Sequence, residues 1–406
     1  MASIGDAVEQ LRSGGIVVVM DDEDRENEGD LIMAAEHVST DKVAFFLEHT
    51  SGFLCTAITG ERADELGLAP MVEENTENQR TAFLTSVDYR RGTTTGISAG
   101  DRAATIRALG DGNVGASEFA RPGHVLPLRA REGGVLKRAG HTEAAVDLCR
   151  MAGLTPAGLL CELVTADRRD MMRRPDIERF ATEHSLPVIT TASLVRHRRM
   201  TSQLVERTGE TDIATEYGVC HAVAYRSKID GAEHLALVYG DVLDGREVLV
   251  RVHSECLTGD VMASLRCDCG PQLRAALEKI AEIGRGVVVY LRGHEGRGIG
   301  LGHKLRAYEL QRRGGMDTVD ANVELGFPVD SREYGEGAQM LADLGVHRVM
   351  LMTNNPHKYG GLSGHSVDVV SRVPLHTPVT EHNIAYLSTK SARLGHDIDL
   401  QMGRSS

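Results

Sequence analysis

The sequence predicts two tandem domains of α+β or mixed α/β type, and three observations carry this prediction. The chain has 406 residues, whereas single hydrophobic cores stop growing near about 250–300 residues. Short β-branched apolar runs alternate with amphipathic stretches of helical period in both halves. Between the halves, residues 200–216 are polar and lack an apolar period, which is typical of a linker. We therefore expect domains over residues 1–201 and 202–406, unrelated to one another because no internal repeat connects them.

The first half predicts a strand that ends at an acidic loop. Residues 16–20 form a β-branched run that stops at the string Asp21-Asp22-Glu23-Asp24. Polar loops at strand ends are common locations for binding sites. Further along, the sequence predicts three helices, at residues 41–48, 142–151 and 194–199. It also predicts a strand at residues 188–190.

The second half predicts four strands and two helices. Its apolar runs are short and rich in valine and leucine, as expected for buried strands. The strands are expected at residues 235–238, 248–252, 287–291 and 349–352, and the helices at residues 272–283 and 303–313.

Composition and charge exclude several classes of protein. The chain is 41% hydrophobic and 25% charged, and it has no apolar run near the roughly 18 residues that a membrane span requires. A formal net charge of −13 argues against a nucleic-acid binder, which needs clustered Lys and Arg. The N-terminal ten residues include Asp6 and Glu9 and lack a secretion signal. We therefore expect a cytoplasmic protein that acts on small anionic substrates held in local cationic pockets.

Carboxylates and a histidine in the first half point to a metal-assisted sugar-phosphate site. Arg25, Glu26 and Asp30 follow the first strand, and residues 138–142 place a cation, glycine, histidine and hydroxyl at a helix start, where phosphates bind. The hydroxyl-rich turn at 93–98, with Arg102 nearby, is a further candidate. A solvated acidic loop and a capped turn are the alternatives. Together the groups indicate a hard divalent cation that bridges sugar oxygens.

Three motifs resemble 3,4-dihydroxy-2-butanone-4-phosphate synthase over roughly residues 1–200: residues 21–30, Arg121-Pro122-Gly123-His124 and Gly140-His141-Thr142-Glu143-Ala144. The resemblance implies Mg²⁺ or Mn²⁺ on Glu26 and His141, with His124 and Glu162 as the catalytic pair. It implies that ribulose 5-phosphate contacts a larger set, Arg25, Glu26, Asp30, Arg138, Ala139, Gly140, His141, Thr142 and Glu162. Cys55 matches a cysteine that lines the family site, although a buried core thiol is an equal alternative.

Three cysteines in the second half indicate a zinc site. Cys256, Cys267 and Cys269 form a C-x10-C-x-C pattern of soft ligands. Structural zinc has four protein ligands, whereas three leave a position for a reactive water. A structural zinc completed by His253 or Cys220 is the alternative.

A glycine-rich segment at residues 292–302 follows the strand predicted at 287–291 and precedes a helix, so its backbone could cradle phosphates. Glycine strings of this kind are weak signals, and the chain has no G-x-x-x-x-G-K-[ST] loop. The segment indicates a binding site only in combination with the three cysteines and the polar run that begins at Arg251.

The combination resembles GTP cyclohydrolase II over residues 203–400, through the motifs at 251–256, 267–269, 295–300, 317–318, 325–327 and 353–356. The resemblance implies Zn²⁺ on the three cysteines, with Mg²⁺ as a further companion of GTP. It implies Asp330 as proton acceptor and Arg332 as nucleophile. The implied GTP contacts are Arg251, Val252, His253, Ser254, Glu255, Gln272, Glu295, Gly296, Arg297, Thr318, Thr353 and Lys358.

The expected activity is therefore bifunctional: ribulose 5-phosphate gives 3,4-dihydroxy-2-butanone 4-phosphate and formate, and GTP gives a diaminopyrimidinone ribosylamino phosphate, formate and diphosphate. Met316 replaces the family's usual tyrosine and cannot donate a hydrogen bond. One alternative is that the GTP reaction stops at the formylated pyrimidine. Another is a zinc-stabilised GTP-binding regulator. The resemblance also implies a homodimer.

Overall fold

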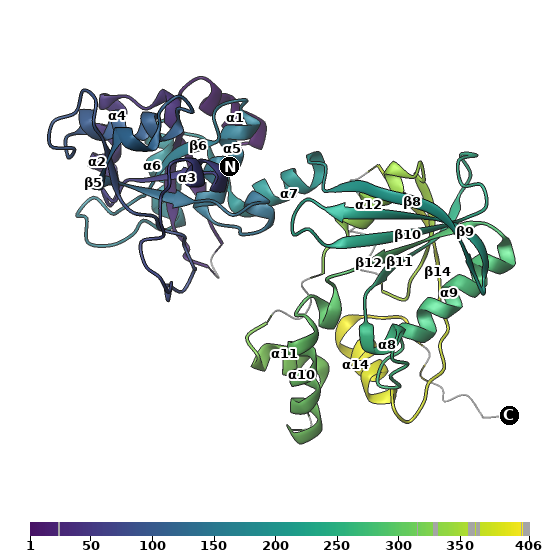
Figure 1. The fold of residues 1–406 in the computed structure, drawn as a ribbon. Coiled ribbons are helices and arrows are strands. Elements are labelled where there is room, and N and C mark those ends of the chain that lie inside the picture. Colours follow the sequence, from purple (N-terminus) through teal and green to yellow (C-terminus); the bar gives the residue numbers. More distant parts are fainter. Residues whose placement is uncertain are drawn as a thin grey trace. The chain divides into compact units, whose positions relative to one another are not determined.

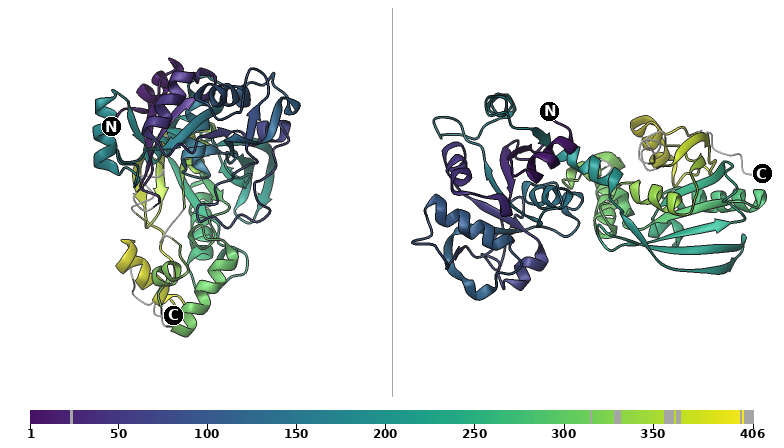
Figure 2. Two further views of the ribbon diagram at one scale, coloured as in Figure 1. Left: turned by 90° about the vertical axis from the view of Figure 1, so that its left-hand side faces the viewer. Right: turned by 90° about the horizontal axis from the view of Figure 1, so that it is seen from above.

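The computed structural model describes residues 1–22, 25–314, 316–327, 332–355, 362, 366–398 and 400. Two compact units make up the chain, unit 1 over Met1–Thr201 and unit 2 over Ser202–Ser406. Each unit is built on a seven-stranded mixed sheet with helices beside it (Figures 1 and 2). These two mixed sheets confirm the predicted fold class.

The sheet of unit 1 has the strand order β4-β5-β3-β6-β2-β1-β7. Its centre is buried on both faces: all four residues of β1 are buried, as are all six of β2. The predicted strands at 16–20 and 188–190 are β1 and β7. The strands are β1 (Val17–Met20), β2 (Gly29–Ala34), β3 (Cys55–Ile58), β4 (Val87–Tyr89), β5 (Phe119–Arg129), β6 (Ala157–Glu162) and β7 (Val188–Thr190).

Helix α5 (His141–Met151) positions the first candidate site. Nine of its residues are buried, from His141 to Cys149, so its first turn is fixed against the sheet. Strands β2 and β6 pair antiparallel with Asp30 opposite Glu162, which brings two predicted site residues together at one end of this strand pair. The other helices of unit 1 are α1 (Ile4–Arg12), α2 (Thr40–His49), α3 (Gly60–Glu65), α4 (Ala99–Gly110), α6 (Arg174–Glu183) and α7 (Thr191–Thr201).

The sheet of unit 2 has the order β14-β13-β11-β12-β10-β9-β8. Strand β11 is central and buried along all seven residues, and it runs parallel to both β12 and β13. The strands are β8 (Val205–Thr215), β9 (Gly218–Ser227), β10 (Glu233–Tyr239), β11 (Val248–Ser254), β12 (Gly286–Leu291), β13 (Arg348–Met352) and β14 (Asp368–Val373). All four strands predicted in this half are confirmed.

Helices α10, α11 and α14 of unit 2 lie side by side (Figure 1). The predicted helices at 272–283 and 303–313 are α9 and α10. The helices of this unit are α8 (Leu257–Asp260), α9 (Cys269–Ile283), α10 (Leu301–Gly314), α11 (Thr318–Glu324), α12 (Gly335–Asp343) and α14 (Ile384–Leu394).

The expected linker at residues 200–216 is wrong. Helix α7 continues to Thr201, and Val205–Thr215 forms β8, an antiparallel partner of β9. Strand β8 is at the edge of the sheet, and seven consecutive residues from Glu206 to Asp212 are exposed. An edge strand whose side chains face solvent has no need of the apolar alternation that identifies a half-buried strand. Among the helices described, none is long and apolar enough to cross a membrane.

Candidate functional site

In unit 1, a carboxylate and imidazole cluster lies between the loop after β1 and the start of α5. Asp21, Glu26 and His141 each offer a ligand atom, and these atoms lie within 4.8 Å of one another. Burial lowers the pKa of His141 to about 4, so its imidazole stays neutral, the form that binds metals. Two carboxylates and one imidazole fit Mg²⁺ or Mn²⁺ in donor type.

Asp21 was not among the predicted ligands, and the structure makes it the organiser of the loop. Its carboxylate is 1% exposed and accepts hydrogen bonds from the backbone N–H groups of Glu26 (3.1 Å) and Glu28 (2.9 Å). The Arg25 guanidinium donates to Asp21 (2.8 Å) and also to Glu26. The acidic string marked this region, but nothing in the string distinguishes Asp21 from its neighbours.

Asp30 and Glu162 form the wall beside this cluster. Asp30 Oδ1 lies 3.5 Å from His141 Nδ1, and burial, then the nearby Glu162, raise the pKa of Asp30 well above its usual range. Glu162 accepts a hydrogen bond of 2.7 Å from the Ser51 hydroxyl. Cys55 is 4% exposed, and its thiol donates to the Phe53 carbonyl. Asp30, whose pKa is raised, therefore lies next to Glu162, whose carboxylate is oriented by Ser51.

Hydrogen bonds to other residues of unit 1 hold the predicted phosphate-binding turn at residues 138–142 in place. Arg138 donates to Glu143 (2.7 Å) and to the Thr81 hydroxyl (2.8 Å). A Cβ atom at Gly140 would lie 2.2 Å from the Arg138 guanidinium, so a larger residue here would displace the end of that side chain. Ala139 is exposed, whereas Gly140 and Thr142 are buried. The turn therefore presents its N–H groups and Arg138 on a fixed frame.

His124 is paired with a residue that the sequence did not single out. Its Nδ1 lies 2.7 Å from Asp88 Oδ2, and its backbone N–H donates to Asp88 Oδ1. A Cβ at Gly96 would lie 2.1 Å from Asp88 and 2.7 Å from His124, so the turn at 93–98 packs directly on this pair. The hydroxyl of Thr94 and the N–H of Gly96 are bound by Asp101, and Arg102 is buried. The turn thus supports His124 and matches the capped-turn alternative.

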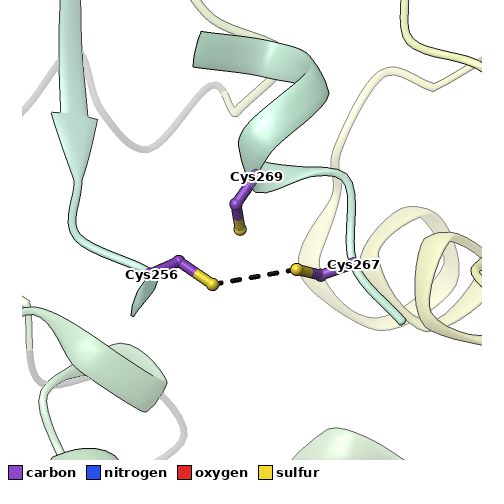
Figure 3. Close-up of side chains that lie close together, drawn as sticks. All are labelled: Cys256, Cys267 and Cys269. Carbon is purple, nitrogen blue, oxygen red and sulfur yellow. Dashed lines mark hydrogen bonds between the residues drawn. The ribbon is translucent and has the colours of Figure 1, made fainter. Parts of the chain in front are cut away.

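In unit 2, the thiols of Cys256, Cys267 and Cys269 converge (Figure 3). Their sulfur atoms lie within 4.8 Å of one another, and Cys256 and Cys267 are 3.7 Å apart. Tetrahedral zinc with Zn–S bonds of about 2.3 Å requires sulfurs about 3.8 Å apart. The pKa of Cys256 is lowered by hydrogen bonds from Cys267 and Cys269 and by the Lys304 ammonium. The donor set and its spacing therefore fit Zn²⁺.

Gly259 of α8 lies directly against the three thiols. A Cβ at this position would be 2.8 Å from Cys267 Sγ, 3.1 Å from Cys256 Sγ and 3.1 Å from the Cβ of Cys269. Any side chain here would displace the sulfur atoms, so the thiol cluster depends on this glycine.

His253 and Cys220, the two alternatives for a fourth ligand, lie elsewhere. His253 Nε2 is bound to Asp260 at 3.1 Å, and its ring stacks on Tyr290. Cys220 is packed in an apolar cluster with Tyr239 and Leu249. Over the described part of unit 2, the thiol cluster has these three cysteines as its members. The structural-zinc alternative thus lacks its fourth protein ligand there.

Lys304 of α10 connects the thiols to the glycine-rich segment. Its ammonium lies 3.1 Å from Cys256 Sγ and also binds Glu295. The second oxygen of Glu295 accepts a 2.6 Å hydrogen bond from the Leu257 N–H. Glu295, predicted as a GTP contact, therefore also holds the segment next to Cys256. Sequence reasoning missed Lys304, whose helix has a polar composition that carries no signal for a site.

Strand β11 presents Arg251 and His253 to the site, whereas the side chain of Val252 enters the core at 1% exposure. A contact of Val252 with GTP would therefore use its backbone. Arg251 is 4% exposed, donates to Gln272 (2.7 Å) and to the Met352 carbonyl (2.9 Å), and its Nε has no hydrogen-bond partner among the described residues. Such a buried guanidinium is suited to a bound anion.

Two adjoining cavities collect most of the predicted GTP contacts. The first borders the thiols and is lined by Ser254, Glu255, Cys256, Cys267, Cys269, Gly296, Arg297, Lys304 and Thr318, among others. The second is lined by Arg251, His253, Gln272, Thr353, Tyr386, Lys390 and His396, among others. Arg332 and Tyr386 line both. Asp330 and Lys358 lie outside the described residues. Met316 is half-buried and is not among the described lining residues.

Comparisons with known proteins find a matching family for each half of the chain. The 3,4-dihydroxy-2-butanone 4-phosphate synthase family matches residues 5–197, and the GTP cyclohydrolase II family matches residues 206–374. The riboflavin biosynthesis protein RibBA of Salinispora arenicola is 57% identical, over 99% of this chain and 97% of that protein. The RIBA 1 protein of Oryza sativa, a probable bifunctional riboflavin biosynthesis protein, is 56% identical over 97% of this chain and 74% of its own length.

A solved structure has a similar fold over most of the chain. It is RibBX of A. baumannii, described as a two-domain 3,4-dihydroxy-2-butanone 4-phosphate synthase. Its TM-score is 0.68 at 36% sequence identity, with 92% of this chain and 99% of that chain covered. The resemblance read from the motifs of both halves is confirmed. The chain therefore belongs to the family of bifunctional riboflavin biosynthesis proteins, which join a 3,4-dihydroxy-2-butanone 4-phosphate synthase to a GTP cyclohydrolase II.

Proposed function

We propose that unit 1 converts ribulose 5-phosphate to 3,4-dihydroxy-2-butanone 4-phosphate and formate. The observation that carries this proposal is the Asp21, Glu26 and His141 cluster beside Asp30 and Glu162. These residues would hold Mg²⁺ or Mn²⁺, which would supply positive charge next to the oxygens of the sugar. Arg138 and the buried turn that follows it are suited to hold the phosphate.

The reaction moves protons at carbons next to carbonyl groups, and the chain offers two groups for this. His124 is oriented by Asp88, as a general base must be. Glu162 is oriented by Ser51, and burial, then the nearby Glu162, raise the pKa of Asp30 beside it well above its usual range. We assign His124 and Glu162 as the catalytic pair, and Arg25, Asp30 and residues 138–142 as substrate contacts.

Unit 2 hydrolyses GTP in this proposal, and the observation that carries it is the three-thiol cluster at the edge of cavities lined by Arg251, Arg297 and Arg332. When bound by the three cysteines, Zn²⁺ supplies a Lewis acid that activates water. Arg251 and Arg297 neutralise the triphosphate. Arg332 is assigned as the nucleophile and Asp330 as the proton acceptor, with Lys358 as a further phosphate contact.

Ring opening and formamide hydrolysis together release one formate per GTP. The experiment supplies GTP with Zn²⁺ and Mg²⁺ and, separately, ribulose 5-phosphate with Mg²⁺, then identifies the products by mass spectrometry and measures formate. We expect the diaminopyrimidinone product with one formate and one diphosphate per GTP.

Two other outcomes would contradict this assignment of unit 2. A product that retains the formyl group would show that the reaction stops at the formylated pyrimidine. Binding of GTP without turnover by the zinc-loaded chain would identify unit 2 as a regulator, a function to which the names of the relatives give no support.

A further inference from the structure

Helix α14 lies beyond the residues that match the GTP cyclohydrolase II family, which end at residue 374. It nevertheless borders both cavities of unit 2. Tyr386 lines the cavity next to the thiols and also the second cavity, which Lys390 and His396 complete. The C-terminal part of the chain therefore supplies an aromatic ring and a cation to a site otherwise built from residues 251–355.

Lys390 is buried in an ion pair at the thiol cluster. Its side chain is on α14, the residue is 7% exposed, and its ammonium lies 2.6 Å from Asp268 Oδ1. Asp268 is 1% exposed and lies between Cys267 and Cys269 in the sequence. A carboxylate removed from water to this degree requires a compensating charge, and breaking such a pair from one side leaves the other charge without compensation.

Asp268 also binds Gln272, one of the predicted GTP contacts. Its second oxygen accepts a 2.5 Å hydrogen bond from the Gln272 amide nitrogen. The Gln272 amide oxygen in turn accepts a 2.7 Å hydrogen bond from Arg251. An amide group that donates on one side and accepts on the other has one orientation, so Lys390, Asp268 and Gln272 together orient the Arg251 guanidinium.

Two more contacts hold the helix in this place. Arg393 donates to Asp317 (2.6 Å) and to Asp320 (2.7 Å), at the N-terminus of α11 and next to Thr318. In the segment that follows the helix, the N–H of Asp397 donates to the Asn354 carbonyl, 3.0 Å away, after β13. Helix α14 and the residues just after it thus contact three of the segments around the cavities.

We propose that α14 is a working part of the GTP site, in which Tyr386 forms the aromatic wall and Lys390 is a positioning residue for Arg251. The inference rests on the proposed function of unit 2, because it takes the ligand to be a purine nucleoside triphosphate. An aromatic wall suits a purine ring, and an oriented buried guanidinium suits a phosphate.

The test replaces Lys390 with Met in the full-length chain, which removes the cation and keeps a side chain of similar length. Lys228→Met is the matched control, since Lys228 is an exposed lysine of the same unit. Binding of a GTP analogue with a methylene group between the α- and β-phosphorus atoms is measured by calorimetry, together with zinc content. The synthase activity of unit 1 reports on the integrity of the preparation.

We expect Lys390→Met to raise Kd for the analogue at least fivefold, with zinc content unchanged, and Lys390→Arg to restore most of the affinity. Tyr386→Ala should raise Kd, whereas Tyr386→Phe should not. A Kd for Lys390→Met within twofold of the control would overturn the proposal. Loss of zinc from this variant would also overturn it, because the effect would then act through the thiols. A wild-type chain that binds the analogue without turning over GTP would contradict the hydrolase assignment alone.

Discussion

The two candidate metal sites of this chain use different chemistry. The cluster in unit 1 consists of two carboxylates and an imidazole on a loop and a helix start, and it suits a hard cation. The cluster in unit 2 consists of three thiols and suits a soft one. Both are buried beside cationic side chains, Arg25 in the first and Lys304 in the second.

This difference teaches that selectivity for two cations in one chain comes from the ligand atoms. Both units place a cationic side chain against the cluster: Arg25 contacts Asp21 and Glu26, and Lys304 contacts Cys256. The two clusters differ in their ligand atoms, which are oxygen and nitrogen in unit 1 and sulfur in unit 2. A change to the ligands of one unit should therefore abolish the activity of that unit alone. The predictions below test this independence.

The largest effect is expected from Cys256→Ser. Loss of an outer partner of a metal ligand typically costs about 10–100-fold, so loss of a ligand itself should lower GTP hydrolysis by more than about 100-fold. Zinc content and diaminopyrimidinone formation are measured, with Cys220→Ser as the control, because Cys220 is a buried cysteine outside the cluster. Synthase activity that fell in parallel would contradict the independence of the two sites.

The converse change is Glu26→Gln, which removes a ligand charge from the cluster of unit 1. We expect formate production from ribulose 5-phosphate to fall by about 100-fold on the same reasoning, while GTP hydrolysis stays within twofold of wild type. Glu9→Gln serves as the control, since Glu9 is an exposed residue of α1. A variant that keeps full synthase activity with Mg²⁺ would remove Glu26 from the metal site.

A smaller effect is expected from Asp88→Asn, which keeps the shape of the partner of His124 and removes its charge. The loss of orientation should lower kcat of the synthase about tenfold, equivalent to about 1.4 kcal/mol, with little change in KM. Steady-state kinetics with ribulose 5-phosphate measure this, and Asp41→Asn is the control, since Asp41 is an exposed residue of α2. A rise in KM at constant kcat would instead place Asp88 in substrate binding.

The smallest effect is expected from Met316→Tyr, which restores the family's usual residue. Met316 is not among the described residues that line the cavities. A residue changes the chemical step only if it interacts with the transition state, and a side chain outside the cavities does not. The ratio of formate to GTP consumed should therefore change by less than about twofold. A large rise in formate yield in the variant would show that the wild-type reaction stops at the formylated pyrimidine.

Buried strands of both units were predictable because their composition is distinctive. Strand β1 and strand β12 are runs of valine with few polar residues, and both were expected within one residue of their bounds. Strand β8 was missed because its side chains are exposed, so its sequence has the polarity of a linker. An edge strand is defined by its backbone pairing, which leaves little trace in the residue pattern.

The candidate sites show the same division. The cysteines and the histidine-bearing turn could be found because their residue types and spacing are characteristic of metal and phosphate binding. Their partners could not be. Asp88 meets His124 across 36 residues, and Lys390 meets Asp268 across 122. Such pairs are created by the fold alone, and a lone aspartate or lysine in a polar segment has no feature that marks it.

The thiol site depends on a single glycine, Gly259. One added methyl group at this position would meet two sulfur atoms at 2.8 and 3.1 Å. The first unit shares none of these atoms and would be untouched. We therefore expect one substitution, Gly259→Ala, to leave the chain with the activity of unit 1 alone.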